Sequence, residues 1–195
     1  MQRPRDTGEV RRMPQRLPAP ARARRHRLLQ EAGSDDEGRL RGDRREVLTK
    51  LVFGYLGQII SRKGLDLLLG AADRLRGTNW ELRVYGEAYQ PDYFAQLQRV
   101  MKKHPRIKYC GPFTPGDLGR LYSEIDVAVV PSRRENYPLT VLEALSARVP
   151  VIATDVGGVR EMVQEGVDGL VVAPHSQEAI AVAMERFLRD PSLVE

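Results

Sequence analysis

Residues 125–155 read IDVAVVPSRRENYPLTVLEALSARVPVIATD, and this stretch decides the fold. The run at 125–131 is strand-length and apolar on both faces, and Pro131 ends it. Apolar residues at helical spacing follow in 139–147, and a second apolar run follows in 150–155. This order predicts a strand, a helix and a parallel strand joined by a right-handed crossover, in a sheet covered on both faces.

The same alternation continues on both sides of this stretch. Strands are expected at 51–57, 80–86, 106–111, 125–131, 150–155 and 169–173, and helices at 64–76, 92–104, 115–124, 139–147, 159–166 and 176–190. Six such units predict an α/β fold, a doubly wound, Rossmann-like parallel six-stranded sheet, in one domain over residues 47–195. Ligands of such sheets bind in the crevice at the carboxyl ends of the strands.

Residues 1–46 differ in composition from the rest. They carry 13 of the 31 Lys and Arg residues and 8 of the 26 Asp and Glu residues, a net charge of +5, so residues 47–195 are neutral overall. Prolines and glycines are frequent and apolar residues few, which predicts a disordered or weakly ordered tail. The alternative, a nucleic-acid-binding arm, lacks aromatic residues among the arginines, so no nucleic-acid partner is expected.

The remaining composition restricts compartment and cofactor. Cys110 is the single cysteine, no apolar run reaches the length of a membrane span, and the N-terminus lacks the apolar core of a signal peptide. We therefore expect a cytoplasmic protein with at most peripheral membrane contact. His26, His104 and His175 are scattered, so neither a metal site nor a metal cofactor is expected.

The loop after the first strand carries two cations. Its glycines, Gly54, Gly57 and Gly64, lack the spacing of a dinucleotide-binding turn, and Lys63-Gly64 lacks the context of a P-loop. Arg62 and Lys63 precede the start of a helix, where a cation is electrostatically unfavoured unless it serves a ligand. A phosphate contact by Lys63 is therefore one interpretation of this loop, and an ordinary surface charge is the other.

The loop after the fourth strand carries a carboxylate and a helix start. Glu135 precedes Pro138, which suits the first turn of the next helix, and the N–H groups of 139–141 form an anion site at the helix N-terminus. Glu143 follows about one turn later, on the same face as Leu139. Either Glu143 faces water, or it accepts hydrogen bonds from a ligand in the crevice, which its apolar neighbours favour.

The turn after the fifth strand contains Gly157-Gly158. Glycine permits close backbone approach, which a phosphate or sugar cradle needs, but a tight strand-to-helix turn needs it equally.

Together these segments resemble the C-terminal domain of family 4 retaining glycosyltransferases with the two-domain GT-B architecture. The resemblance covers residues 47–190 and rests on GYLGQIISRKGLDLLLGAADRL and PSRRENYPLTVLEALSARVPVIATDVGGVREMVQEGVDGLVV. It implies that Glu135, the first glutamate of a Glu-x7-Glu motif, holds donor sugar hydroxyls. It also implies that Glu143 binds the nucleotide ribose and Lys63 the diphosphate. The implied catalytic residues are Glu135 and Lys63, and the implied donor-binding residues are Gln58, Arg62, Lys63, Glu135, Asn136, Tyr137, Pro138, Leu139, Thr140 and Glu143.

The resemblance implies a retaining hexosyltransferase-type enzyme, which transfers a sugar from a nucleotide diphosphate sugar to an acceptor hydroxyl without a metal. The acceptor is unknown, and the partner would be a separate N-terminal glycosyltransferase domain. The sequence departs from the family at Gln58, where the family has a phosphate-binding arginine, and at Arg148, where it has a glycine. Residues 1–46 are not expected to replace the family's acceptor-binding N-terminal domain. The alternative is a non-catalytic nucleotide-sugar-binding or interaction module.

Overall fold

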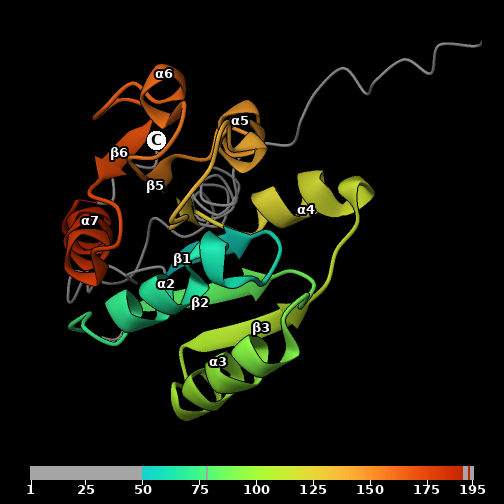
Figure 1. Cartoon of the computed structure of the whole chain (residues 1–195). Coiled ribbons are helices and arrows are strands. Elements are labelled where there is room, and N and C mark those ends of the chain that lie inside the picture. Colours follow the sequence, from blue (N-terminus) through green and yellow to red (C-terminus); the bar gives the residue numbers. More distant parts are fainter. Residues whose placement is uncertain (1–49, 78, 191–192, 194–195) are drawn as a thin grey trace, which may run out of the picture.

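The computed structural model describes residues 50–77, 79–190 and 193 (Figure 1). The predicted tail, residues 1–46, lies outside the described residues. The domain boundary at residue 47 therefore stays a prediction.

All six predicted strands form, each within two residues of its expected bounds. They are β1 (Leu51–Leu56), β2 (Trp80–Tyr85), β3 (Ile107–Gly111), β4 (Val127–Val130), β5 (Val151–Thr154) and β6 (Gly169–Val172). They pair in parallel in the order β3-β2-β1-β4-β5-β6. The prediction of a doubly wound parallel sheet is thus confirmed. Strands β2 and β3 are added on one side of β1, and strands β4 to β6 on the other, so the strand order reverses between β1 and β4. Such folds bind their ligands at this point.

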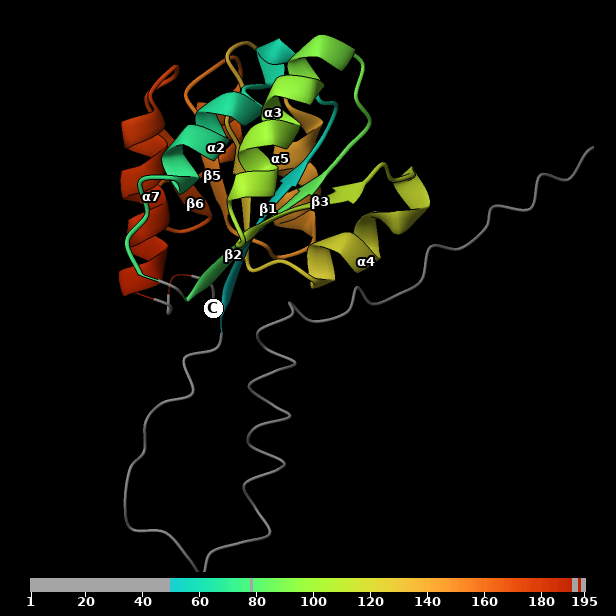
Figure 2. The ribbon, with the colours of Figure 1, turned by 90° about the horizontal axis from the view of Figure 1, so that it is seen from below.

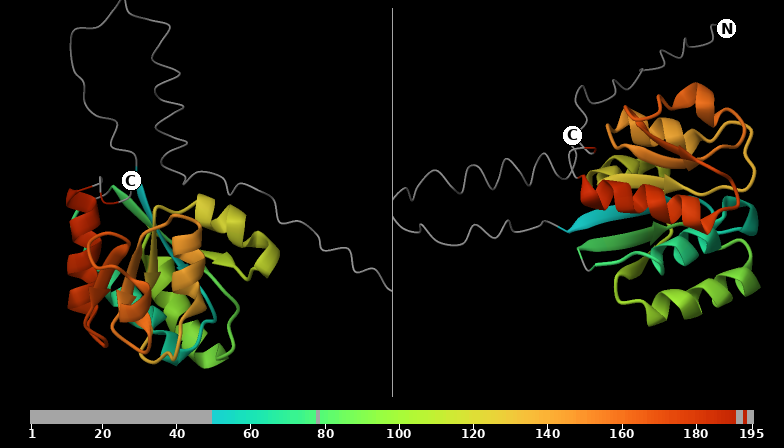
Figure 3. Two further views of the ribbon diagram at one scale, coloured as in Figure 1. Left: turned by 90° about the horizontal axis from the view of Figure 1, so that it is seen from above. Right: turned by 90° about the vertical axis from the view of Figure 1, so that its left-hand side faces the viewer.

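Helices cover both faces of the sheet (Figures 2 and 3). On one face lie α2 (Leu65–Ala72), α3 (Pro91–Lys103) and α7 (Gln177–Arg189). On the other lie α4 (Leu118–Ser123), α5 (Leu139–Ser146) and α6 (Val159–Met162). Alternate residues of the central strands enter the two cores: Phe53 faces α2, and Val52 faces α4 and α5. This burial on both faces explains why the central strands are continuously apolar.

Three predicted helices are shorter in the structure. The helix expected over 159–166 is a single turn, α6, because the chain from Gln164 turns back and Gly166 donates to the Gly169 carbonyl at 2.8 Å. The helix expected over 64–76 ends at Ala72. A short 3-10 turn, Pro115–Asp117, precedes α4.

Helix α5, which leads from the crevice back towards the next strand, has a well-defined C-terminal end. Arg148 adopts a left-handed φ of 57°. Its N–H donates to the Leu145 carbonyl, and the N–H of Val149 donates to the Ala144 carbonyl, both at 2.9 Å. This is the Schellman motif, whose left-handed residue is usually glycine.

Candidate functional site

The carboxyl ends of β1 and β4 bring the two predicted charged loops together. Lys63 Nζ lies 2.5 Å from Glu135 Oε1, and Arg62 Nη1 lies 3.6 Å from Glu135 Oε2. The Glu135 side chain is 9% exposed and that of Lys63 18%, whereas that of Arg62 is 52% exposed. The cluster therefore holds one buried anion and two cations, and its excess positive charge is on the solvent side.

Backbone geometry places Lys63 at this point. Lys63 ends a 3-10 turn, Ser61–Lys63, and Gly64 then takes a left-handed φ of 70°. A Cβ on Gly64 would lie 2.0 Å from the Pro131 carbonyl oxygen, so the two loops touch through their main chains. Only glycine fits this position, which explains the Lys-Gly pair in the sequence.

Glu135 is held from its own loop as well. The Ser132 hydroxyl donates to Glu135 Oε1 at 3.0 Å. The Ser132 carbonyl in turn accepts from the buried Thr154 hydroxyl at the end of β5, at 2.5 Å. A buried carboxylate needs such partners, because an unpaired charge in the protein interior is strongly destabilising.

The glycine pair after β5 has a structural task. Gly157 has a φ of 54°, and a Cβ there would lie 2.4 Å from the carbonyl oxygens of Glu135 and Asn136. The N–H of Gly158 donates to the Asn136 carbonyl at 2.9 Å. The glycines thus allow the third loop to support the second, which favours the turn interpretation at this position.

The N-terminus of α5 adjoins the same loop. Pro138 is the residue before the first helical turn, with no side-chain cap. The Val141 N–H bonds to the Pro138 carbonyl at 3.0 Å, so the predicted anion site narrows from three N–H groups to those of Leu139 and Thr140. Uncapped N–H groups at a helix start attract anions through hydrogen bonding and the helix dipole.

Glu143 is half-buried on α5 and contacts α4 instead of the Lys63 cluster. The Tyr122 hydroxyl lies 3.4 Å from Glu143 Oε2 and 3.2 Å from the Thr140 carbonyl oxygen. Burial and the Glu143 charge both raise the pKa of Tyr122, so its hydroxyl stays protonated and remains a donor. The two glutamates of the Glu-x7-Glu spacing therefore have separate partners, Lys63 for Glu135 and Tyr122 for Glu143.

The other predicted site residues line the same loops. Gln58 is exposed, and its carbonyl accepts from the Tyr55 hydroxyl at 2.7 Å. Asn136 is exposed, Pro138 is buried and Thr140 is half-buried. Tyr137 and Leu139 are 52% and 64% exposed, which is high for large apolar side chains.

Sequence reasoning missed one strong interaction, between Asp66 and Arg133. The guanidinium contacts both carboxylate oxygens, at 2.7 and 2.6 Å, and the Ser61 carbonyl at 2.7 Å. Tyr122, the partner of Glu143, was missed as well. No local pattern reveals such pairs, because the partners meet only through the order of strands in the sheet.

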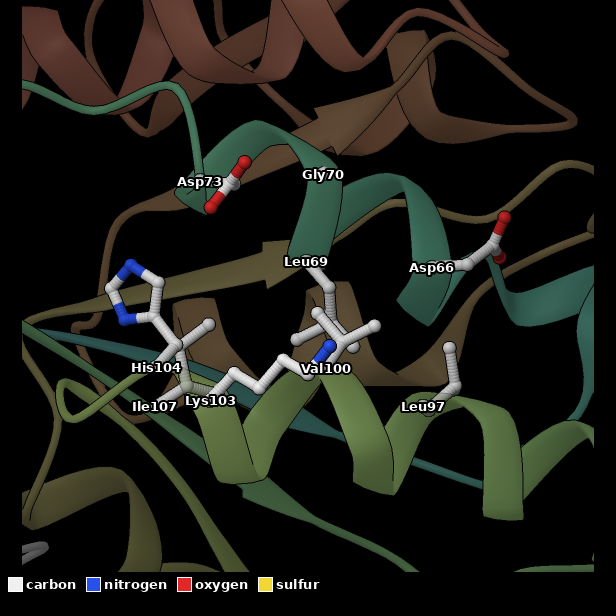
Figure 4. A pocket seen from close by; sticks show the side chains of 9 residues that line it. All are labelled: Asp66, Leu69, Gly70, Asp73, Leu97, Val100, Lys103, His104 and Ile107. Atoms are coloured by element: carbon white, nitrogen blue, oxygen red, sulfur yellow. The ribbon is translucent and has the colours of Figure 1, made fainter.

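Two grooves lie away from this cluster. One, of about 310 Å³, runs between α2 and α3 over Leu69, Leu97 and Val100 (Figure 4). The other, of about 360 Å³, lies over β2, β3 and α4. Asp66 stands at one end of the first groove with its carboxylate pointing away from Asp73 and His104 (Figure 4). Neither groove includes Lys63, Glu135 or Glu143.

The described residues contain no group of three or more His, Cys, Asp and Glu that could hold a metal ion. Within the same residues, no helix is both long enough and apolar enough to cross a membrane.

Known proteins are similar to this chain in sequence. Residues 36–195 match the family described as glycosyl transferases group 1. The α-D-kanosaminyltransferase of Streptomyces kanamyceticus is 32% identical over 179 residues, 91% of this chain and 43% of that protein. This chain thus spans less than half the length of that relative.

Two solved structures have a similar fold. One is the C-terminal domain of a glycosyl transferase group 1 family protein from Francisella tularensis, 26% identical, with a TM-score of 0.66 over 74% of this chain and 78% of that chain. The other is an Anabaena protein, HepE, in complex with UDP-glucose, 20% identical, with a TM-score of 0.69 over 89% of this chain and 44% of that chain. The chain therefore belongs to the glycosyl transferases group 1, and the part described here is the C-terminal, Rossmann-like domain of their GT-B fold.

Proposed function

We propose that this domain binds a nucleotide diphosphate sugar at the carboxyl ends of β1 and β4 and supplies the donor half of a retaining glycosyltransferase. The observation that carries the proposal is the Lys63–Glu135 pair beside the uncapped N-terminus of α5. Cation, buried carboxylate and helix N–H groups together match the diphosphate and the hydroxyl-rich sugar of such a donor.

The diphosphate would lie between Lys63 and the N–H groups of Leu139 and Thr140. Arg62, more exposed than Lys63, would add a second cation and compensate for Gln58, which cannot contribute a charge. This arrangement stabilises the charge that develops on the diphosphate as it leaves. Tyr137, Pro138 and Asn136 would shape the wall of the same site.

Glu135 would have two tasks. Through Oε1 it holds Lys63 in place, and Oε2 keeps acceptor capacity for a sugar hydroxyl. Glu143, with Tyr122 behind it, would accept hydrogen bonds from the ribose.

The proposed reaction breaks the bond between the sugar anomeric carbon and the diphosphate oxygen. A new bond forms from the acceptor hydroxyl oxygen to the same carbon, with retention of configuration. The acceptor proton passes to the leaving phosphate. The acceptor itself would be held by an N-terminal glycosyltransferase domain, outside the part of the fold described here.

Titration calorimetry of the chain with UDP, GDP and ADP and their sugars tests the proposal. One nucleotide should bind, and Lys63→Ala should weaken it about tenfold by removing a charge-assisted contact. Lys102→Ala, at an exposed position of α3, is the matched control and should leave affinity unchanged. Absence of binding to every nucleotide, or equal losses in both variants, would refute the proposal.

A second candidate is a non-catalytic nucleotide-sugar-binding module. Gln58 favours it, because one phosphate-binding charge of the family is missing. Donor hydrolysis or sugar transfer by the chain, alone or with an N-terminal domain, separates the two. Turnover that Glu135→Ala abolishes would exclude the module.

A further inference from the structure

Arg133 connects the two loops of the site at three points. Its N–H donates to the Arg62 carbonyl at 2.8 Å, and its guanidinium donates to the Ser61 carbonyl at 2.7 Å and to both Asp66 carboxylate oxygens. We call these contacts the loop clamp. They bracket Lys63, since they fix the two residues before it and a residue three positions after it.

The clamp is partly removed from solvent. The Arg133 side chain is 27% exposed and that of Asp66 33%. The Tyr93 hydroxyl from α3 donates to Asp66 Oδ1 at 2.6 Å, so a third element supports the pair. Burial alone would raise the pKa of Asp66, but hydrogen bonds from Arg133 and Tyr93 hold it below its usual value. A two-point, half-buried pair of this kind is stronger and more directional than a surface ion pair.

The clamp meets the site cluster only through the Arg62 main chain, and no ion pair joins the Arg133 or Asp66 side chain to Lys63 or Glu135 among the described residues. Arg133 lies two positions before Glu135, yet its guanidinium turns to Asp66 while Glu135 turns to Lys63. Lys63 thus reaches from the first loop to Glu135, and Arg133 reaches from the second loop to Asp66 on α2, in two separate pairs. The Asp66–Arg133 pair fixes the loop main chains, and the Lys63–Glu135 pair presents the charge.

We propose that Asp66 and Arg133 are positioning residues, which hold Lys63 in the orientation that binds the donor diphosphate; this rests on the proposed function. A loop that is already fixed in its binding geometry loses little conformational entropy when the ligand binds. Breaking the clamp should therefore weaken the diphosphate contact made by Lys63 in particular, beyond any general loss of stability.

A double-mutant cycle on donor affinity tests this. Asp66→Asn should weaken nucleotide binding about tenfold in the wild-type background and less than about twofold in the Lys63→Ala background. The free energy of unfolding, in contrast, should fall by the same amount in both backgrounds. Asp73→Asn, an equal charge change at the other end of α2, should leave affinity unchanged. Equal losses of affinity in both Lys63 backgrounds would overturn the proposal and leave a purely structural role.

Two further measurements keep the test decisive. If Asp66→Asn does not fold, Tyr93→Phe removes one support of Asp66 and should give a smaller coupled loss, about threefold. If no nucleotide binds the wild type, the proposed function fails, but the clamp is still testable by amine labelling and mass spectrometry. Asp66→Asn should raise labelling of Lys63 several-fold relative to Lys102. Unchanged Lys63 labelling would overturn the clamp independently of the donor.

Discussion

Lys63 and Glu135 form an ion pair of 2.5 Å between the loops that follow β1 and β4. The pair lies at the point where the strand order of the parallel sheet reverses, next to the N-terminus of α5. Because Glu135 is the more buried partner, the charge that remains available to a ligand is the cation.

Replacing Glu135 with glutamine should change two affinities in opposite directions. The free diphosphate no longer competes with a carboxylate for Lys63, so a nucleoside diphosphate should bind about threefold tighter. The nucleotide sugar loses an acceptor for its hydroxyls. The ratio of its affinity to that of the plain nucleoside diphosphate should therefore fall about tenfold. Calorimetry with both ligands checks this. Equal weakening of both would contradict the sugar-binding role.

Glu143 should determine whether the site distinguishes ribose from 2′-deoxyribose. A carboxylate acceptor for the ribose hydroxyls should make the deoxynucleotide about tenfold weaker, and Glu143→Ala should remove that difference. Tyr122→Phe is the matched control, because it removes the neighbouring hydroxyl and leaves the carboxylate. It should lower the free energy of unfolding by about 1 kcal/mol while the ribose preference persists. A preference unchanged in Glu143→Ala would place the ribose elsewhere.

Glycine at position 148 should make the domain more stable than alanine does. The φ of Arg148, 57°, lies in the left-handed region that side chains disfavour. Arg148→Gly should therefore exceed Arg148→Ala in free energy of unfolding by about 1 kcal/mol in urea titrations, even though glycine gains more entropy on unfolding. Ala147→Gly, one residue earlier at φ −84°, should be destabilising and serves as the control. If glycine is no better than alanine at Arg148, strain is absent there.

Glu81 should give the domain part of its acid sensitivity. Burial favours its neutral form, but Lys108, Lys50 and Arg83, each at 2.8 Å, outweigh this and lower the pKa from 4.5 to about 2. The folded state thus binds the proton more weakly than the unfolded state. The stabilisation is complete above about pH 4.5 and is lost as pH falls towards about 2.

Glu81→Gln should accordingly lower the free energy of unfolding at pH 7 by about 1–3 kcal/mol. The variant should also lose less stability than the wild type between pH 5 and about pH 3. Urea titrations at several pH values measure both effects, with exposed Glu161→Gln as the control. Parallel pH profiles for wild type and Glu81→Gln would contradict the assignment.

The sequence predicted most of the fold because burial leaves a local trace. Strands such as 127–130 are apolar on both faces, and helices such as 177–189 repeat apolar residues at helical spacing, so both are visible without tertiary information. The length of α6 was not visible in this way. Its end depends on the hydrogen bond from Gly166 to Gly169, which forms only once β6 is in place.

The sequence singled out the residues of the candidate site, whose roles stay predictions, but it did not reveal how their side chains pair. Lys63 and Glu135 were each expected to face a ligand, and the structure shows that they also face each other. The local sequence does not predict the Asp66–Arg133 pair, because each residue is typical of an ordinary surface charge in its own segment. Pairing across loops depends on strand order, which periodicity does not encode.

Gly157 illustrates a consequence for anyone who searches this domain for function by random mutagenesis. A side chain there would collide with the carbonyl oxygens of Glu135 and Asn136. The displaced main chain would then shift the Glu135 carboxylate that holds Lys63. A variant at Gly157 would therefore look like a loss of ligand chemistry, although the residue offers no chemical group of its own. Maps of mutational sensitivity in this domain will therefore include residues that support one loop against another. The residues that contact the ligand will be only a part of the sensitive positions.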